Sequence, residues 1–194
     1  EFTGAGGVAN GNAFYQVSQG EGKVVGLDLL ISQRWSNYTT WLAYTLSRSR
    51  RTFSELFRGA SYAAQDDRPH QLQWANEYQY QRWSLSGVYI FASGRPYLDL
   101  AVSDLTNDRR ERSVSSLRRI PAYHRVDVSA RYAYPMEKGE VYGSLGVFNL
   151  LDRANTLYSQ RIYSLPEENN RNVLLGNELQ LLGRTVSVAV GVKF

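Results

Sequence analysis

The side chains that could carry out chemistry are few in this sequence. There are two histidines, His70 and His124, and no cysteine, which removes disulfides, thiolate nucleophiles and cysteine-ligated metals. His124 falls in the same alternation class as its apolar neighbours, so we do not pair it with Asp127 as a catalytic base. No nucleophile–base arrangement can be assembled, and we expect no catalytic residue and no cofactor.

Two pairs of carboxylates raise the question of a metal site. Asp66-Asp67 and Glu167-Glu168 lie in predicted loops and could hold a calcium ion. Solvated loop carboxylates explain the same pattern more simply, so we expect no metal.

Some of the arginines fall into two groups. The first lies in one predicted loop and comprises Arg109, Arg110, Arg112, Arg118 and Arg119. These side chains could attract an anionic substrate or contact phosphates, and a merely solvated loop is the alternative. The second group, Arg125 and Arg131 with Asp127, shares one side of a predicted strand and suggests a salt-bridge network. The net charge of +4 is too small and too scattered to indicate nucleic-acid binding.

Period-2 alternation predicts the elements that position these residues. In the last strand, Val186, Val188, Val190, Val192 and Phe194 share one side, and Thr185, Ser187, Ala189, Gly191 and Lys193 share the other. Similar alternation predicts strands near 23–32, 39–47, 71–80, 83–92, 125–134 and 141–151. This makes seven strands of roughly 10–14 residues, the length of a tilted membrane-spanning strand.

The connections alternate strictly between short and long. Residues 35–37, 81–82 and 135–139 are short links, whereas 48–67, 94–119 and 152–182 are long polar stretches. Outer-membrane barrels arrange periplasmic turns and extracellular loops in this way. Residues 1–22 are rich in Gly, Asn and Gln, and we expect an extracellular loop or the end of a preceding strand there.

Alternation alone fits both a membrane barrel and a soluble one, whose apolar side would face inward. Charged residues such as Asp28 and Glu77 fall in the class that is rich in Ser, Thr, Gln and Gly. Aromatic residues favour the membrane barrel, because they gather beside the short links: Trp35, Tyr38, Tyr78, Tyr80, Trp83, Tyr132, Tyr134 and Phe194. Such a girdle marks a membrane interface. The sequence contains no run of eighteen apolar residues, so it does not predict a membrane-spanning helix.

Several segments then resemble one family. The segments 67–72 (DRPHQL), 83–89 (WSLSGVY), 93–97 (SGRPY), 120–127 (IPAYHRVD), 147–152 (VFNLLD) and 182–194 resemble successive strands near the end of TonB-dependent outer-membrane receptors. Residues 23–31 (KVVGLDLLI) resemble a slightly earlier strand. The resemblance implies a 22-stranded antiparallel barrel in a Gram-negative outer membrane, with an N-terminal plug on which TonB pulls. Lipid and lipopolysaccharide would surround it, and the arginine-rich loop could contact lipopolysaccharide phosphates.

The expected architecture is therefore all-β. Residues 23–194 would be C-terminal strands of the barrel, and the plug and remaining strands would come from another chain or a missing N-terminal part. Glu77, Arg125, Asp127 and Arg131 would face the lumen and plug. Val190, Val192 and Phe194 resemble the terminal signal that the barrel-assembly machinery recognises.

The expected function is active uptake of a scarce nutrient such as a siderophore, corrinoid, oligosaccharide or peptide. The alternative is a small self-closed structural or adhesive barrel, which would need residues 1–17 as a further strand. A soluble β-protein comes third.

Overall fold

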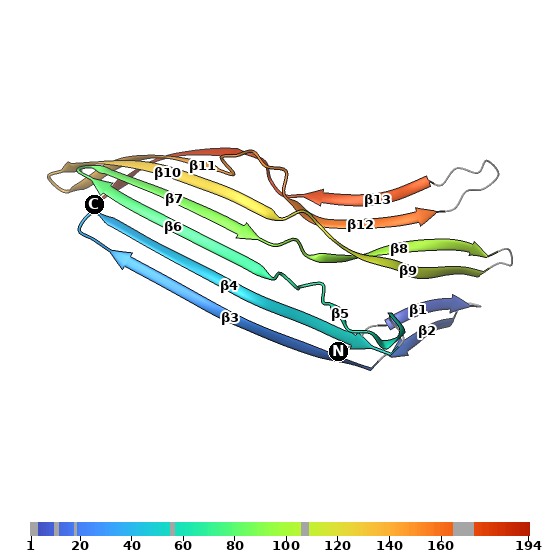
Figure 1. Ribbon diagram of the computed structural model, residues 1–194. Helices are drawn as coiled ribbons and strands as arrows, with labels where there is room; N and C mark the ends of the chain where they lie inside the picture. The colour runs from blue at the N-terminus through green and yellow to red at the C-terminus, as the bar shows by residue number, and fades with distance from the viewer. Residues whose placement is uncertain (1–3, 10–11, 18, 55–56, 106–108, 165–172) are drawn as a thin grey trace.

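Seven long strands form one antiparallel sheet in the computed structural model (Figure 1). The structure describes residues 4–9, 12–17, 19–54, 57–105, 109–164 and 173–194, and for 4–17, 98–116 and 160–176 its description is limited to the backbone within those ranges. The sheet runs in the order β14-β11-β10-β7-β6-β4-β3. Its members are β3 (Gly20–Arg34), β4 (Tyr38–Phe53), β6 (His70–Tyr80), β7 (Trp83–Ala92), β10 (Tyr123–Met136), β11 (Gly139–Phe148) and β14 (Thr185–Lys193). The seven predicted strands are confirmed.

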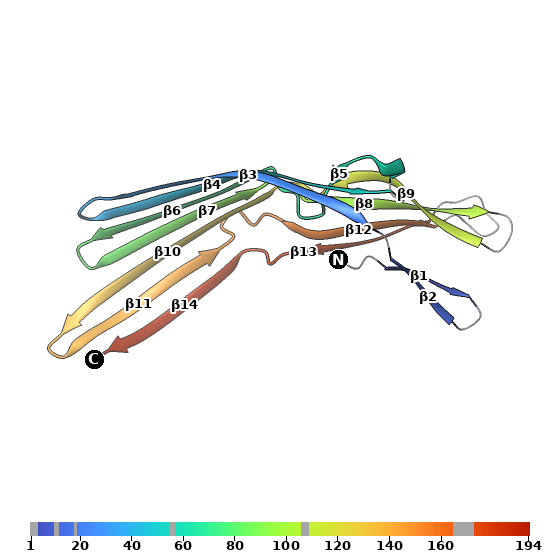
Figure 2. The same ribbon diagram turned by 90° about the horizontal axis from the view of Figure 1, so that it is seen from below.

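The sheet is a curved wall. In Figure 1, β3, β4, β6 and β7 are spread out while β11 and β14 overlap, and the view turned by 90° in Figure 2 spreads β10, β11 and β14. Different strands are therefore seen face-on in the two views, as in a curved sheet. β3 and β14, at the two ends, do not pair with each other among the described residues, so the wall is open.

The strand registers carry each alternation class across the whole wall. One row joins Leu29, Tyr44, Leu72 and Phe91 through successive strand pairs. A row of the other class joins Thr39, Glu77, Ser86 and Ser129. We call these surfaces the apolar face and the polar face.

The apolar face has no protein cover. Val188 and Val190 of β14 are 73% and 78% exposed, and the described buried hydrophobic residues are Phe53, Ala64, Ala92 and Ile120 alone. A soluble barrel would bury this face as its core, with a gain of roughly 25 cal/mol for each Å² removed from water. The face instead suits contact with lipid. Among the described residues, no helix is long and apolar enough to cross a membrane.

The short links carry the predicted aromatic girdle. Trp35 and Tyr38 stack with ring centroids 5.4 Å apart, and Trp83 meets Tyr132 at 4.9 Å. The Arg82 guanidinium lies 4.6 Å from the Tyr134 ring. These rings lie at one end of the sheet, as an interfacial belt requires.

The long connections are more ordered than predicted. β8 (Pro96–Leu105) pairs with β9 (Arg109–Arg119), and β12 (Thr156–Ser164) pairs with β13 (Val173–Gln180). Together they form a second sheet of order β13-β12-β8-β9, in which β8 and β12 are parallel. β4 extends to Phe53 and is followed by a 3₁₀ turn, η1 (Phe57–Gly59), and by β5 (Tyr62–Ala63), which pairs with β4. The expectation of irregular chain over 48–67, 94–119 and 152–182 was therefore wrong for most of these residues.

The chain crosses itself where β9 leads into β10. β9 pairs with β8, whereas β10 lies on the far side of β7, so residues 120–122 must pass the β7–β8 link. The Ile120 amide donates to the Arg95 carbonyl at 3.0 Å. A Cβ added to Gly94 would lie 1.7 Å from the Ile120 oxygen. Only glycine permits this approach of two backbones.

The N-terminal segment is a hairpin of β1 (Gly4–Ala9) and β2 (Asn12–Val17). Within the described part of the chain, neither strand joins the seven-stranded sheet. The predicted loop or strand end therefore contains a hairpin, and the described residues 4–9 and 12–17 add no eighth strand to the wall.

Candidate functional site: the polar face and its outer end

The polar face holds a charged cluster at the start of β10. The Arg125 Nε lies 2.9 Å from Asp127 Oδ2, and Asp127 Oδ1 accepts a hydrogen bond from the Asn149 amide at 2.9 Å. Arg125 also donates to the Tyr123 hydroxyl at 2.9 Å, and its guanidinium lies 4.3 Å from the Phe148 ring. The cluster fixes the ends of β10 and β11 to each other.

The predicted network is split into two ion pairs. Arg131 does not join Arg125 and Asp127 but binds Glu140 at 2.6 Å, and its guanidinium lies 4.2 Å from the Tyr142 ring. Glu140 follows the third short link. The β10–β11 register pairs it with Pro135, and the Arg131 side chain reaches it along the polar face from four residues earlier in β10. Sequence analysis missed Glu140 because hairpin register decides which carboxylate is near.

Glu77 lies on the polar face as predicted. It accepts a hydrogen bond from the Gln79 side chain at 3.2 Å. Its register partners are Thr39 on β4 and Ser86 on β7, so this part of the face is polar without an ion pair to a described residue. Contact of these side chains with a plug stays a prediction.

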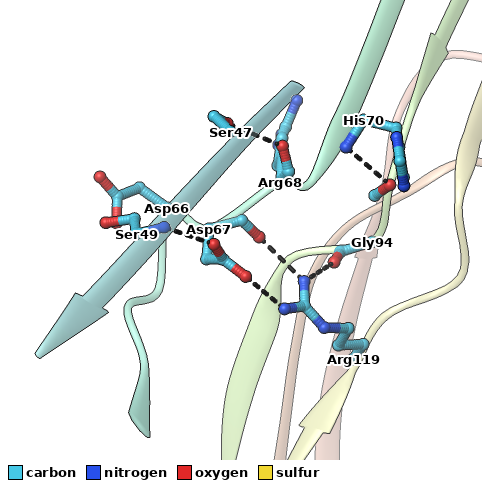
Figure 3. Close-up of polar contacts among 9 residues, drawn as sticks. Ser47, Ser49, Asp66, Asp67, Arg68, His70, Gly94 and Arg119 are labelled. Atoms are coloured by element: carbon cyan, nitrogen blue, oxygen red, sulfur yellow. Dashed lines mark hydrogen bonds and ion pairs between the residues drawn. The ribbon is translucent and has the colours of Figure 1, made fainter. Parts of the chain in front are cut away.

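An ion pair with a buried carboxylate holds together the end of the sheet that lies opposite the short links, here called its outer end (Figure 3). Arg119 at the end of β9 pairs with the carboxylate of Asp67, whose side chain is 3% exposed. Arg119 also donates to the Asp67 carbonyl at 3.0 Å and to the Gly94 carbonyl at 2.8 Å. Asp67 Oδ1 accepts from the Ser49 amide at 2.6 Å. We call this cluster the Asp67–Arg119 clamp.

The clamp bears on two expectations. Asp67 is not a solvated loop carboxylate, because its side chain is buried and pairs with Arg119, whereas Asp66 is exposed. Arg119 is already paired with Asp67 within the chain. Its contact with lipopolysaccharide or substrate stays a prediction. Arg118 also has a partner interaction. The side chains of Arg109, Arg110 and Arg112 lie outside the described residues, so their role stays a prediction.

Beside the clamp, the polar face encloses a cavity of about 370 Å³ at the outer end of β4, β6 and β7. The first residues of β12, Thr156 and Leu157, and Leu181 before β14 line it as well. The polar lining includes Thr45, Gln71, Gln73, Arg68, Arg95 and Tyr123. We call this space the outer cavity.

Two arginines of the outer cavity lie close enough to repel each other. Burial lowers the pKa of Arg68 below its usual value, and the neighbouring charge of Arg95 lowers it further. Arg68 belongs to the link before β6, and Arg95 to the link between β7 and β8. Arginine stays charged at neutral pH under such a shift, so the outer cavity carries positive charge.

Both histidines lie on the apolar face and bond to tyrosines. The Tyr44 hydroxyl lies 2.7 Å from His70 Nδ1, and the Tyr89 hydroxyl lies 3.0 Å from His124 Nδ1. His124 and Asp127 lie on opposite faces of the sheet. In the described part of the chain, no three His, Asp or Glu residues gather into a possible metal site.

Comparison with known families accounts for this arrangement. Residues 2–150 match the family model described as TonB dependent receptor-like, beta-barrel. The chain belongs to this family. The resemblance of segments 67–72, 83–89 and 93–97 is thus confirmed, and the antiparallel sheet is a segment of a receptor barrel. No curated protein and no solved structure matches the chain.

Family membership fixes location and class. TonB-dependent receptor barrels lie in the outer membrane and act in transport, not as enzymes. The apolar face is then the lipid-facing side, and the short links are periplasmic. That the polar face, with Glu77, Arg125, Asp127 and Arg131, lines the lumen stays a prediction. The outer cavity and the Asp67–Arg119 clamp consequently lie at the extracellular end.

The terminal strand matches its predicted pattern. Val190 and Val192 pair with Gly143 and Val141 of β11, and they remain 78% and 49% exposed on the apolar face. Phe194 is 95% exposed. Recognition of these three residues by the barrel-assembly machinery stays a prediction.

Proposed function

We propose that this chain forms part of the barrel wall of a receptor that takes up a scarce nutrient actively, such as a siderophore, corrinoid, oligosaccharide or peptide. The observation that carries the proposal is the polar face, which continues across seven strands and ends in a cavity at the extracellular side. A passive channel needs only polar side chains that contact water along its lumen. Here they form fixed clusters such as Arg125–Asp127 and Arg131–Glu140.

The remaining strands of the barrel pair with β3 and β14 in this proposal. Both strands present unpaired backbone groups along one side of the open wall. In lipid each unsatisfied N–H or C=O group costs several kcal/mol, so only a closed barrel is stable there. The lumen-facing Glu77, Arg125, Asp127 and Arg131 would then lie against a plug on which TonB acts.

Uptake assays in a Gram-negative host test the proposal. Cells that express the complete receptor and cells that lack it are compared with labelled ferric siderophores, cyanocobalamin, maltooligosaccharides and small peptides. We expect one class to accumulate only in cells with the receptor, and accumulation to stop when TonB is deleted or a protonophore is added. Surface binding on ice should persist in both treatments.

Two outcomes would overturn the proposal. Accumulation that rises linearly with concentration and ignores TonB would indicate a passive pore. A protein that runs alone on gels as a compact, heat-modifiable species of 22 kDa would indicate the self-closed barrel.

A further inference from the structure

The outer cavity holds two positive charges that no carboxylate of its described lining balances. Elsewhere on the polar face, Arg125 is paired with Asp127 and Arg131 with Glu140. No Asp or Glu is among the described residues that line the outer cavity, although Arg68 and Arg95 both line it. The charges of two arginines are therefore left uncompensated within the described part of the chain.

The surrounding fold holds the Arg95 guanidinium and the backbone at Arg68. The Arg95 side chain donates to the Leu157 carbonyl at 2.5 Å, and the Arg95 carbonyl accepts from the Ile120 amide. The Arg68 carbonyl accepts from the Ser47 hydroxyl at 3.1 Å, next to the Asp67–Arg119 clamp. These contacts leave donors of both guanidinium groups available, because each group has five N–H donors.

Neutral donors and acceptors complete the lining. Thr45, Gln71 and Gln73 project from β4 and β6 on the polar face, and Tyr123 comes from the start of β10. The volume of about 370 Å³ lies within the range of small-molecule sites, which have few polar groups placed to fix orientation. Guanidinium groups bind carboxylate and phosphate with paired hydrogen bonds.

We propose that the outer cavity binds an oxyanion group, carboxylate or phosphate, of a small solute, with Arg68 and Arg95 as the charged contacts. The assignment rests on the proposed receptor function, in which the solute arrives from the extracellular side. Burial and the mutual repulsion of the two arginines both favour an anion, because an anion would offset each of these costs.

A second hollow fits this proposal less well. It has a volume of about 1020 Å³ and lies against the edge strand β3 and the outer part of β4. Its lining includes Lys23, Arg48 and Arg50, but it also includes the carboxylates of Glu21 and Asp67. Its positive charge is thus partly balanced within the chain.

Isothermal titration of the complete receptor in detergent tests the proposal, with citrate and inorganic phosphate as anionic probes and maltose as the neutral probe. Arg68→Gln and Arg95→Gln should each weaken binding of at least one anionic probe about tenfold or more, the effect of losing a charge-assisted hydrogen bond. Arg34→Gln is the matched control, because Arg34 pairs with Thr39 on the same face at the periplasmic end. It should leave affinity unchanged.

Lysine variants separate loss of charge from loss of fold. Arg68→Lys and Arg95→Lys keep the charge but lose the guanidinium geometry, so their affinities should lie between those of the wild type and the glutamine variants. Each variant is first checked for wild-type heat-modifiability on gels.

Three outcomes would overturn the assignment. The first is that the wild type binds no anionic probe. The second is that the Arg→Gln variants bind it as tightly as the wild type does. In either case the arginines would instead pair with a carboxylate of the plug or serve only the fold. Competition of citrate by added lipopolysaccharide would assign the site to a lipid phosphate instead. Titration measures binding without TonB, so the two proposals can fail separately. A receptor that binds citrate but transports no solute would refute the proposed function alone. A receptor that transports a solute but binds no oxyanion would refute this site alone.

Discussion

Replacing Asp67 with alanine should loosen the outer end of the sheet. The change leaves the buried Ser49 amide without its acceptor, at a cost of about 1–3 kcal/mol, and removes the partner of Arg119. Removing one member of a fully buried ion pair costs about 3–5 kcal/mol, but the Arg119 side chain is 40% exposed and can recover hydration. We therefore expect a local loss of about 2–4 kcal/mol in total.

Hydrogen exchange measures this loss directly. Since about 1.4 kcal/mol corresponds to a factor of ten, the Ser49 amide should exchange about 30- to 700-fold faster in Asp67→Ala than in the wild type. The amides of β9 near Arg119 should also lose protection, whereas those beside the short links should not change. Asp66→Ala is the matched control, because Asp66 is exposed and accepts a single weak hydrogen bond from the Ser49 hydroxyl at 3.3 Å.

A double-mutant cycle shows whether the ion pair itself is responsible. Asp67→Asn, Arg119→Gln and the double variant are compared at the same amide, and a coupling of about 1 kcal/mol or more is expected for groups in direct contact. Equal exchange in Asp67→Ala and Asp66→Ala, or additive effects in the cycle, would refute the argument.

Two further changes test other parts of the fold. Gly94→Ala would place a Cβ 1.7 Å from the Ile120 oxygen, so the crossing should open and limited proteolysis should cut the β8–β9 hairpin sooner. Gly87→Ala is the control, because its added Cβ has its nearest neighbour at 4.0 Å. Equal cleavage rates in the two variants would contradict the crossing. Val188→Arg on the apolar face should destabilise folding into lipid vesicles by about 2–4 kcal/mol, and Ser187→Arg on the polar face by much less. Equal losses in the last two variants would contradict the assignment of faces.

The wall could be predicted from sequence because lipid imposes a strict rule on it. Each membrane-spanning strand needs apolar side chains at every second position, and β14 shows this pattern plainly. The β8–β9 hairpin lies beyond the membrane, where that requirement ends. Its second strand reads RRERSVSSLRR, and charge in both alternation classes hides the strand from a search for hydrophobic periodicity.

The site was predicted only in outline. Alternation predicts that Glu77, Arg125, Asp127 and Arg131 share one face, and the strand registers place them together on the polar face. That they face the lumen and plug stays a prediction. The ion-pair partners were not predicted, because Asp67 and Arg119 lie 52 residues apart and meet only where the chain crosses at Gly94. The segment 67–72 was noticed as a family resemblance, but its aspartate was interpreted as solvated. The outer cavity joins residues of separate links, and sequence spacing gives no signal for such a meeting.

The central claim is that one face of this wall contacts lipid and the other lines the lumen of a receptor barrel. The chain has no cysteine, so single cysteines along residues 84–91 of β7 can each carry one nitroxide label in the complete receptor in membranes. Collision with oxygen, which concentrates in lipid, should peak at positions 85, 87, 89 and 91 and fall at the positions between them. Peaks at the even positions, or no period of two, would contradict the account.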